Sequence, residues 1–173
     1  MSEITRVQKE QEFALSVPKI VGTLGLGKVM APIYESIHGV LKKNNLEFGK
    51  DCMPFARYNG VNWEELTKKG FLSAIKLFFF YKWDLNIGIT CPESIPPEGP
   101  IEKMQIHGGE YLRIIHKGPY QKVGDTYEKV LSYAKARKIK MDDYSIEFYL
   151  NDPREVAPES LETEVLLPII EKG

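Results

Sequence analysis

The sequence has few of the residues that build metal sites, disulfides or nucleophilic active sites. It contains two cysteines, Cys52 and Cys91, which are far apart and lie in no motif, and three histidines without metal-ligand spacing. No ordered set of serine, histidine and aspartate accompanies a nucleophile elbow. We therefore expect no metal and no cofactor, and we expect two buried thiols in a reducing compartment.

The chain also lacks an excess of charge of one sign and a long hydrophobic run. Its 23 Lys and Arg residues nearly balance 24 Asp and Glu residues, and the net charge of -1 favours neither nucleic acid nor an anionic membrane as a partner. Residues 1–13 have no apolar signal-peptide core. The most hydrophobic run, 71–81, is broken by Lys76 and is too short to span a bilayer. These features predict a cytoplasmic protein without membrane contact.

The sequence does contain two amphipathic helices among short strands. Residues 28–44 place an apolar residue at every fourth position and end in cations, and residues 119–138 repeat this pattern after a Gly-Pro turn. The expected strands are 13–24, 54–58, 82–89, 101–106, 110–116, 144–150 and 161–169. Residues 62–69 predict a short helix capped by Asn62, whereas residues 71–81 fit a buried helix or a strand.

The two halves of the chain share one order of elements: strand, glycine turn, helix, strand, connection, strand. The first half covers residues 12–91 and the second covers 101–170, and a linker with four prolines joins them at 91–100. This internal repeat predicts an α+β fold in which two βαββ units are related by a pseudo-twofold axis within one domain, 1–173.

Glutamates stand in the last two strands where an apolar residue would be usual. Alternation places Glu147 and Tyr149 on one face of their strand, and Glu164 on one face of the next. If these strands pair, two carboxylates and a tyrosine line one side of a sheet whose other side is core. The repeat matches Tyr58 with Tyr149 and Asn86 with Glu164. We expect these side chains to meet at a groove between the halves, where small molecules commonly bind.

Three motifs together resemble the GyrI-like small-molecule-binding domain, the effector-binding domain of AraC-type and BmrR-like regulators. They are residues 116–120 (HKGPY), 146–153 (IEFYLNDP) and 163–169 (TEVLLPI). The resemblance is strong over 101–170 and looser over 12–95, and residues 59–81 look like an insertion relative to shorter members. It implies a duplicated βαββ fold with a curved antiparallel sheet, two main helices and a central ligand groove. No helix-turn-helix region precedes the first strand, so we expect a stand-alone member without a DNA-binding domain.

The resemblance also implies a pocket of aromatic side chains around acidic residues, suited to lipophilic cations. Carried over by position, Glu164 is the expected pocket acid, and Glu147 and Tyr149 are its neighbours. Burial among aromatic rings should raise the pKa of such a carboxylate. Trp63 is a candidate lid, whereas residues 78–80 (FFF) are expected to enlarge the core. The full set of expected ligand-binding residues is Glu164, Glu147, Tyr149, Tyr58, Trp63, Asn86 and Tyr120.

Four functions fit these features. The first is a binding protein that holds a lipophilic or cationic small molecule in the aromatic groove. The second is a hydrolase of electrophilic cytotoxic compounds in which Glu164 activates water as a general base. The third is a tetrapyrrole-binding protein of the SOUL type, with His38 or His116 as iron ligand. The fourth is a regulatory interaction with another protein. The sequence leaves open the ligand, catalytic turnover and the oligomeric state.

Overall fold

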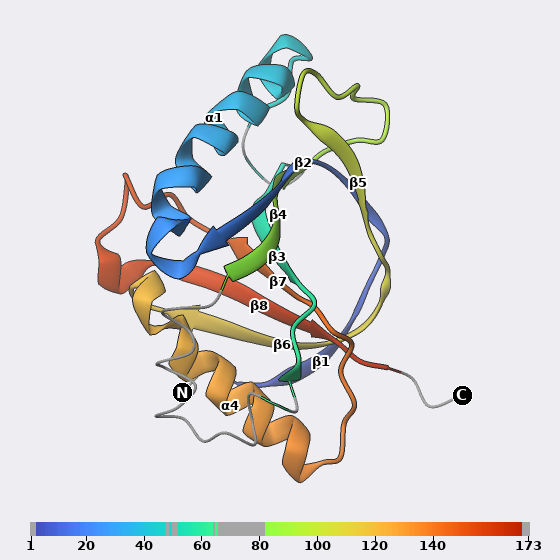
Figure 1. Ribbon diagram of the computed structural model, residues 1–173, viewed down its shortest axis with the longest axis vertical. Coiled ribbons are helices and arrows are strands. Elements are labelled where there is room, and N and C mark those ends of the chain that lie inside the picture. Colours follow the sequence, from blue (N-terminus) through green and yellow to red (C-terminus); the bar gives the residue numbers. More distant parts are fainter. Residues whose placement is uncertain (1–2, 48, 50–51, 64, 66–81, 171–173) are drawn as a thin grey trace.

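The computed structural model describes residues 3–47, 49, 52–63, 65 and 82–170. Within these residues, eight strands form a single antiparallel sheet, and two long helices lie on one of its faces (Figure 1). The strands are β1 (Thr5–Lys9), β2 (Glu12–Gly22), β3 (Pro54–Asn59), β4 (Lys82–Thr90), β5 (Glu102–Ile106), β6 (Gly109–Lys117), β7 (Ser145–Tyr149) and β8 (Glu162–Pro168). The helices are α1 (Leu26–Lys43) and α4 (Val123–Ala136), and short 3-10 turns occupy Thr23–Gly25, Tyr120–Lys122 and Pro158–Ser160.

The sheet confirms the predicted α+β architecture of two βαββ units. The strand order is β1-β6-β8-β7-β3-β4-β2-β5, so the unit β2-α1-β3-β4 lies beside the unit β6-α4-β7-β8. The units meet where β3 pairs with β7, and Ala56 lies opposite Glu147 in that register. Because the repeat matches Tyr58 with Tyr149, Ala56 is also the repeat counterpart of Glu147. This pair therefore marks the pseudo-twofold axis.

The two remaining strands exchange between the halves and curl the sheet into a half-barrel. β1 precedes β2 in the chain but pairs with β6, and β5 precedes β6 but pairs with β2. The two connecting segments pack closely: a Cβ at Gly108 would lie 2.9 Å from the backbone nitrogen of Gln11 and 3.0 Å from the carbonyl oxygen of Lys9. Only glycine fits this contact without displacing the backbone.

Strand alternation divides the core into two parts, one on each face of the sheet. The larger part lies on the face covered by the helices, which we call the helical face. There, Ile37 and Leu41 of α1 pack with Leu85 and Ile87 of β4. A smaller cluster lies on the opposite face, and its members are Ala14, Phe55, Ile106, Tyr111, Tyr144, Ile146, Phe148 and Leu166.

Local features of the chain agree with these positions. Pro18 lies within β2 but beyond Ser16, the last residue that β5 pairs, so its missing N–H falls at a free edge. The predicted N-cap is confirmed, because the Asn62 side chain accepts a hydrogen bond of 3.0 Å from the Glu65 nitrogen. The expectations for 71–81 and for the phenylalanines 78–80 lie outside the described residues.

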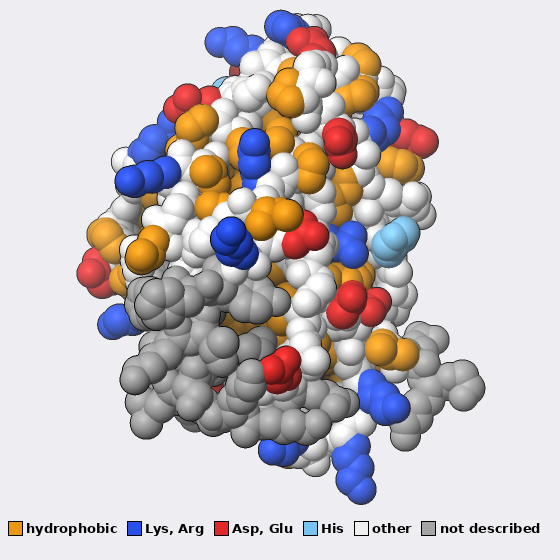
Figure 2. All heavy atoms as spheres, viewed as in Figure 1, with side chains coloured by type: hydrophobic (Ala, Val, Ile, Leu, Met, Phe, Trp, Pro, Cys, Tyr) orange, Lys and Arg blue, Asp and Glu red, His pale blue; other side chains and the backbone are white. Residues whose placement is uncertain are grey.

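The surface and the helices add two observations. Lys, Arg, Asp and Glu side chains are interspersed over the face seen in Figure 2, in line with the near-zero net charge. Among the described residues, no helix combines the length and the apolar character needed to cross a membrane.

Candidate functional site

A cavity of about 1730 Å³ lies on the helical face of the sheet, with residues of both α1 and α4 in its walls. Glu147 lies on its floor, and the carboxylate belongs to the strand at the centre of the sheet. The aromatic residues that line the cavity are Tyr34, Tyr58, Trp63, Trp83, Tyr120, Tyr127 and Tyr149. As far as the described residues define it, the cavity therefore has one central acid within walls that are largely aromatic.

Two tyrosine hydroxyls hold the Glu147 carboxylate in place. Tyr127 donates a hydrogen bond of 3.0 Å to Oε1, and Tyr149 donates one of 3.2 Å to Oε2. Only 4% of Glu147 is exposed. No Lys, Arg or His among the described residues forms an ion pair with it. Within the described part of the chain, the acid is thus buried with hydrogen-bond donors but without a countercharge.

Burial raises the pKa of Glu147 from its ordinary value of 4.5 to about 7. Removing a carboxylate from water disfavours its charged form. The hydroxyls of Tyr127 and Tyr149 act in the opposite direction, because their hydrogen bonds favour the charged form, and the hydroxyl of Tyr58 adds a smaller effect of the same sign. Near neutral pH the site therefore holds both forms of the acid, and a cation in the cavity would stabilise the ionised one.

The register between β3 and β7 explains why a carboxylate can occupy the centre of the sheet. Ala56 lies directly across from Glu147 on β3, and Val165 lies across from it on β8. The repeat counterpart of the acid is thus a methyl group, so the two halves are asymmetric at their axis. A second large or charged side chain at position 56 would crowd the carboxylate.

The tyrosines next to the acid are packed edge to face. The ring of Tyr149 lies 5.4 Å from the ring of Tyr120 and 6.3 Å from that of Tyr34, both in T-shaped arrangements. The hydroxyl of Tyr34 donates to the carbonyl oxygen of Phe55 at 2.9 Å. Such pairs favour a defined ring geometry over a loosely filled space. The aromatic wall on this side is therefore preorganised around Glu147.

Trp63 completes another wall. Its ring stacks on Tyr127 at 5.9 Å with an interplanar angle of 14°, and its indole N–H donates to the carbonyl oxygen of Asp142 at 2.6 Å. Close by, the Val61 nitrogen donates to the carbonyl oxygen of Asp143 at 2.6 Å. These bonds tie the segment after β3 to the segment before β7. Trp63 is a buried part of the wall, and its expected role as a lid stays a prediction.

Five of the seven expected ligand-binding residues line the cavity, and two do not. Glu147, Tyr149, Tyr58, Trp63 and Tyr120 are brought together on the helical face. Glu164 and Asn86 lie on the opposite face, since Glu164 pairs with Phe148 and Asn86 pairs with Arg57. The side-chain amide oxygen of Asn86 accepts a hydrogen bond of 3.0 Å from Asn59.

The expectation that both carboxylates share one side of the sheet is wrong. β7 and β8 pair so that Val165, rather than Glu164, lies beside Glu147. Alternation within each strand was interpreted correctly, but a shift of one residue in register moves a side chain to the other face. The sequence contains no feature near these strands that fixes this register.

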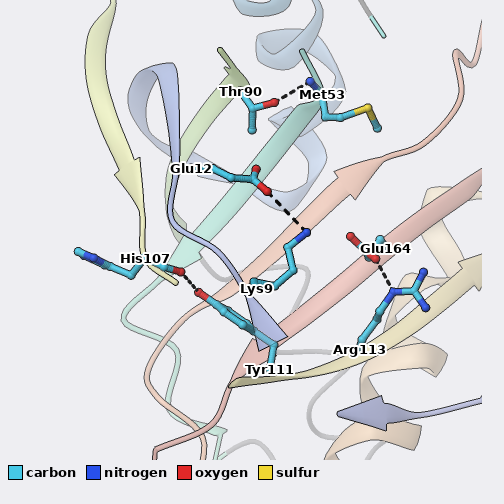
Figure 3. Close-up of polar contacts among 8 residues, drawn as sticks. All are labelled: Lys9, Glu12, Met53, Thr90, His107, Tyr111, Arg113 and Glu164. Carbon is cyan, nitrogen blue, oxygen red and sulfur yellow. Dashed lines mark hydrogen bonds and ion pairs between the residues drawn. The ribbon is translucent and has the colours of Figure 1, made fainter. Parts of the chain in front are cut away.

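Glu164 instead belongs to a cluster of charged side chains at a smaller cavity of about 490 Å³ (Figure 3). Its Oε1 accepts a hydrogen bond from Nε of Arg113. Lys9 lies 3.7 Å from a carboxylate oxygen of Glu12, and its ammonium stands 5.6 Å from the centre of the Phe148 ring. Both carboxylates in this cluster have a cationic partner, whereas Glu147 has none among the residues that the structure describes.

Sequence reasoning missed three residues that line the main cavity. They are the aromatic residues Tyr34, Trp83 and Tyr127, and each lies in a segment that the sequence pattern assigns only to a helix or a strand. Tyr58 and Trp83 pack with ring centres 5.4 Å apart. A tyrosine within an amphipathic stripe that faces a predicted buried acid is a signal that could have identified Tyr127 and Tyr34.

The histidines proposed as iron ligands have different surroundings. His116 is buried, and its ring nitrogens lie 2.8 Å from the hydroxyl of Thr126 and 3.1 Å from the carbonyl oxygen of Pro119. Both nitrogens therefore already have hydrogen-bond partners. His38 lines the main cavity. The described residues contain no group of three or more His, Cys, Asp and Glu placed to hold a metal ion.

Comparison with known structures supports this fold. The C-terminal domain of EcmrR shares 16% sequence identity at a TM-score of 0.77, over 99% of both chains. The chain also matches EcmrR in a complex with DNA, at 17% identity and a TM-score of 0.77, but it spans only 58% of that longer protein.

Two further structures are similar at lower identity. A hydrolase from Listeria innocua shares 14% identity at a TM-score of 0.65, over 97% of this chain and 92% of the other. SAV2435 bound to tetraphenylphosphonium shares 13% identity at a TM-score of 0.59, over 97% and 94%. No curated protein matches the chain.

A family model for the GyrI-like small molecule binding domain matches residues 81–170, which is just over half of the chain. The matched segment contains α4, which carries Tyr127, and β7, which carries Glu147 and Tyr149. On this match, and with the duplicated fold that accompanies it, the chain belongs to the GyrI-like small molecule binding domain family.

Proposed function

We propose that the protein binds a small lipophilic cation in the cavity on the helical face, with Glu147 as its charge partner. The observation that carries this proposal is the buried Glu147 carboxylate, which no described cation neutralises. A carboxylate in such a place is costly unless it is protonated or paired. A ligand cation supplies the missing charge, and the aromatic rings bind it through cation–π contacts.

The charge of the cavity rim supports a cationic ligand. The described acidic residues that line the cavity are Glu35, Asp125, Glu128, Glu147, Asp152 and Glu155, whereas the described basic ones are Lys135 and Arg154. Because the low-dielectric walls focus the field of these charges, the cavity should attract cations and disfavour anions. The similar SAV2435 structure, bound to tetraphenylphosphonium, suggests a suitable probe.

The test is a calorimetric titration with tetraphenylphosphonium at pH 8, where Glu147 is mostly ionised. The unmodified protein should bind, and Glu147→Gln should weaken binding by roughly tenfold to a hundredfold, as expected for loss of a charged partner. Glu164→Gln is the matched control, because that acid lies on the other face. Equal loss in both variants, or loss in Glu164→Gln alone, would contradict the proposal.

A hydrolytic reaction is the second candidate, and the raised pKa of Glu147 is the observation that favours it. A carboxylate whose pKa is about 7 can take a proton from water near neutral pH. In this reaction Glu147, rather than Glu164, would be the general base toward an electrophilic ligand. Product formation from an electrophilic probe, lost in Glu147→Gln while binding of the probe persists, would support turnover. Binding of the probe without any product over hours would contradict turnover and leave only the proposal of ligand binding.

A further inference from the structure

The two cysteines, distant in the sequence, lie next to the paired ends of β3 and β4. The register of β3 and β4 ends with the pair Pro54 and Ile89, and two further hydrogen bonds join the residues that follow. The Thr90 nitrogen donates to the carbonyl oxygen of Met53 at 3.0 Å, and the Met53 nitrogen donates to the Thr90 hydroxyl at 2.8 Å. Cys52 and Cys91 are the next residues along these two segments. Both belong to the core cluster on the helical face.

The ladder gives this pair the spacing of a cross-strand disulfide. The backbone hydrogen bond from Thr90 to Met53 places these two residues opposite each other. If the strands continue in the same direction, Cys52 and Cys91 fall at the neighbouring position without hydrogen bonds, where Cα atoms lie about 4.5 Å apart. Disulfides join Cα atoms about 4.4 to 6.8 Å apart. Burial, and after it the Cys52 thiol, raises the pKa of the Cys91 thiol, as expected for two thiols on neighbouring segments.

We propose that Cys52 and Cys91 form a reversible disulfide, with a low-molecular-weight disulfide such as oxidised glutathione as the oxidant. Both side chains carry thiols in this structure. At 7% exposure Cys91 is more accessible than Cys52 at 1%. Small disulfides therefore reach Cys91 first.

The reaction proceeds by two exchange steps. The Cys91 thiolate attacks one sulfur of oxidised glutathione, forming a mixed disulfide and releasing one glutathione thiol. The Cys52 thiolate then attacks the Cys91 sulfur, which forms the protein disulfide and releases the second glutathione thiol. The protein loses two electrons and two protons, and oxidised glutathione is reduced to two thiols. Because the reacting species is the thiolate, the rate should increase with pH.

The disulfide would act on the ligand cavity as well as on stability. Cys52 and Met53 line the main cavity, and the closed loop from Cys52 to Cys91 contains β3, Trp63 and Trp83. The crosslink fixes the ends of two strands that form the cavity floor and walls. It restricts the unfolded chain, so the oxidised protein should unfold at a higher temperature than the reduced one.

The test is to treat the folded full chain with oxidised glutathione at pH 8 and to measure thiols, intact mass and melting temperature without reductant. Both thiols should disappear together, the mass of the chain should fall by two hydrogens, and no disulfide should join two chains. The melting temperature should rise until dithiothreitol reverses it. In Cys52→Ser, Cys91 should retain a glutathione adduct, because the resolving thiol is gone.

Three results would overturn the proposal. One is a stable glutathione adduct on the unmodified protein, since the second thiol should displace it. Another is a disulfide between chains. The third is oxidation that occurs only in denaturant, because it would show that the folded ladder does not bring the sulfurs together.

Discussion

At the scale of single residues, Glu147 determines the chemistry of the cavity. Its carboxylate is almost fully buried, accepts two tyrosine hydrogen bonds and has no described countercharge. Natural proteins keep such a group when its function outweighs its cost in stability. That cost depends on pH in a way that can be measured.

Glu147 should make the protein less stable as the pH rises from about 4.5 to about 7. Its pKa is raised in the folded state, so the folded protein binds the proton more tightly than the unfolded chain does. Stability is then highest when the acid is protonated and decreases until the folded-state pKa is passed. Glu147→Gln removes this dependence.

Urea denaturation checks this prediction at two pH values. At pH 8 the Gln variant should have a higher free energy of unfolding than the unmodified protein, by up to about 3 kcal/mol. At pH 4 the two should agree. Lower stability of the variant at pH 8 would mean that the ionised carboxylate is already paired in the folded protein.

At the scale of elements, the segment after β3 is fixed to the segment before β7 through Trp63. Trp63→Ala removes both the stack on Tyr127 and the hydrogen bond to Asp142. We expect this change to destabilise the protein by about 3 kcal/mol or more, as is usual for truncating a buried tryptophan. It should also weaken tetraphenylphosphonium binding, because Tyr127 loses the ring that positions its hydroxyl on Glu147.

Trp63→Phe is the matched control for this prediction, since it keeps an aromatic ring on Tyr127 but lacks the N–H. It should retain most of the affinity while losing part of the stability. Thermal denaturation and calorimetric titration separate the two effects. Unchanged ligand affinity in Trp63→Ala would count against any role of Trp63 in the site.

The close contact between the β1–β2 and β5–β6 connections leads to a second prediction at this scale. Gly108→Ala places a methyl group against backbone atoms of Lys9 and Gln11, and it should destabilise the protein by roughly 1–3 kcal/mol. Gly39→Ala is the control, because a Cβ at this position meets nothing within 4 Å. This change should raise the free energy of unfolding by about 0.5–1 kcal/mol, since alanine favours the helix more than glycine does. Similar melting temperatures for both variants would show that the close contact tolerates movement.

At the scale of the whole molecule, the sequence predicts the duplication of the fold but not which polar side chains lie on which face of the sheet. The amphipathic stripes, the proline-rich linker and the family motifs indicate two βαββ units, and the strand order confirms them. The position of Glu164 was predicted wrongly because strand register depends on packing across the sheet. For the same reason the sequence alone shows Cys52 and Cys91 only as separate thiols, because the pairing of β3 with β4 is not visible in the residues near either cysteine.

The pseudo-twofold axis also explains why this symmetric fold has an asymmetric site. The second half supplies Glu147 and the two tyrosines that bind it, whereas the first half places Ala56 across from the acid. A single charge on the axis suits a monovalent ligand. Binding of that ligand to the folded state should stabilise the whole chain, by about 2.7 kcal/mol at a concentration one hundred times its dissociation constant.

The central claim is that a cation binds beside Glu147, and proton release measures this directly. Calorimetric titration with tetraphenylphosphonium at pH 7, in two buffers of different ionisation enthalpy, gives the number of protons released. The unmodified protein and Glu164→Gln should each release about half a proton per ligand, because a nearby cation lowers a pKa of about 7, and Glu147→Gln should release none. Proton release that persists in Glu147→Gln, or that disappears in Glu164→Gln, would contradict the claim.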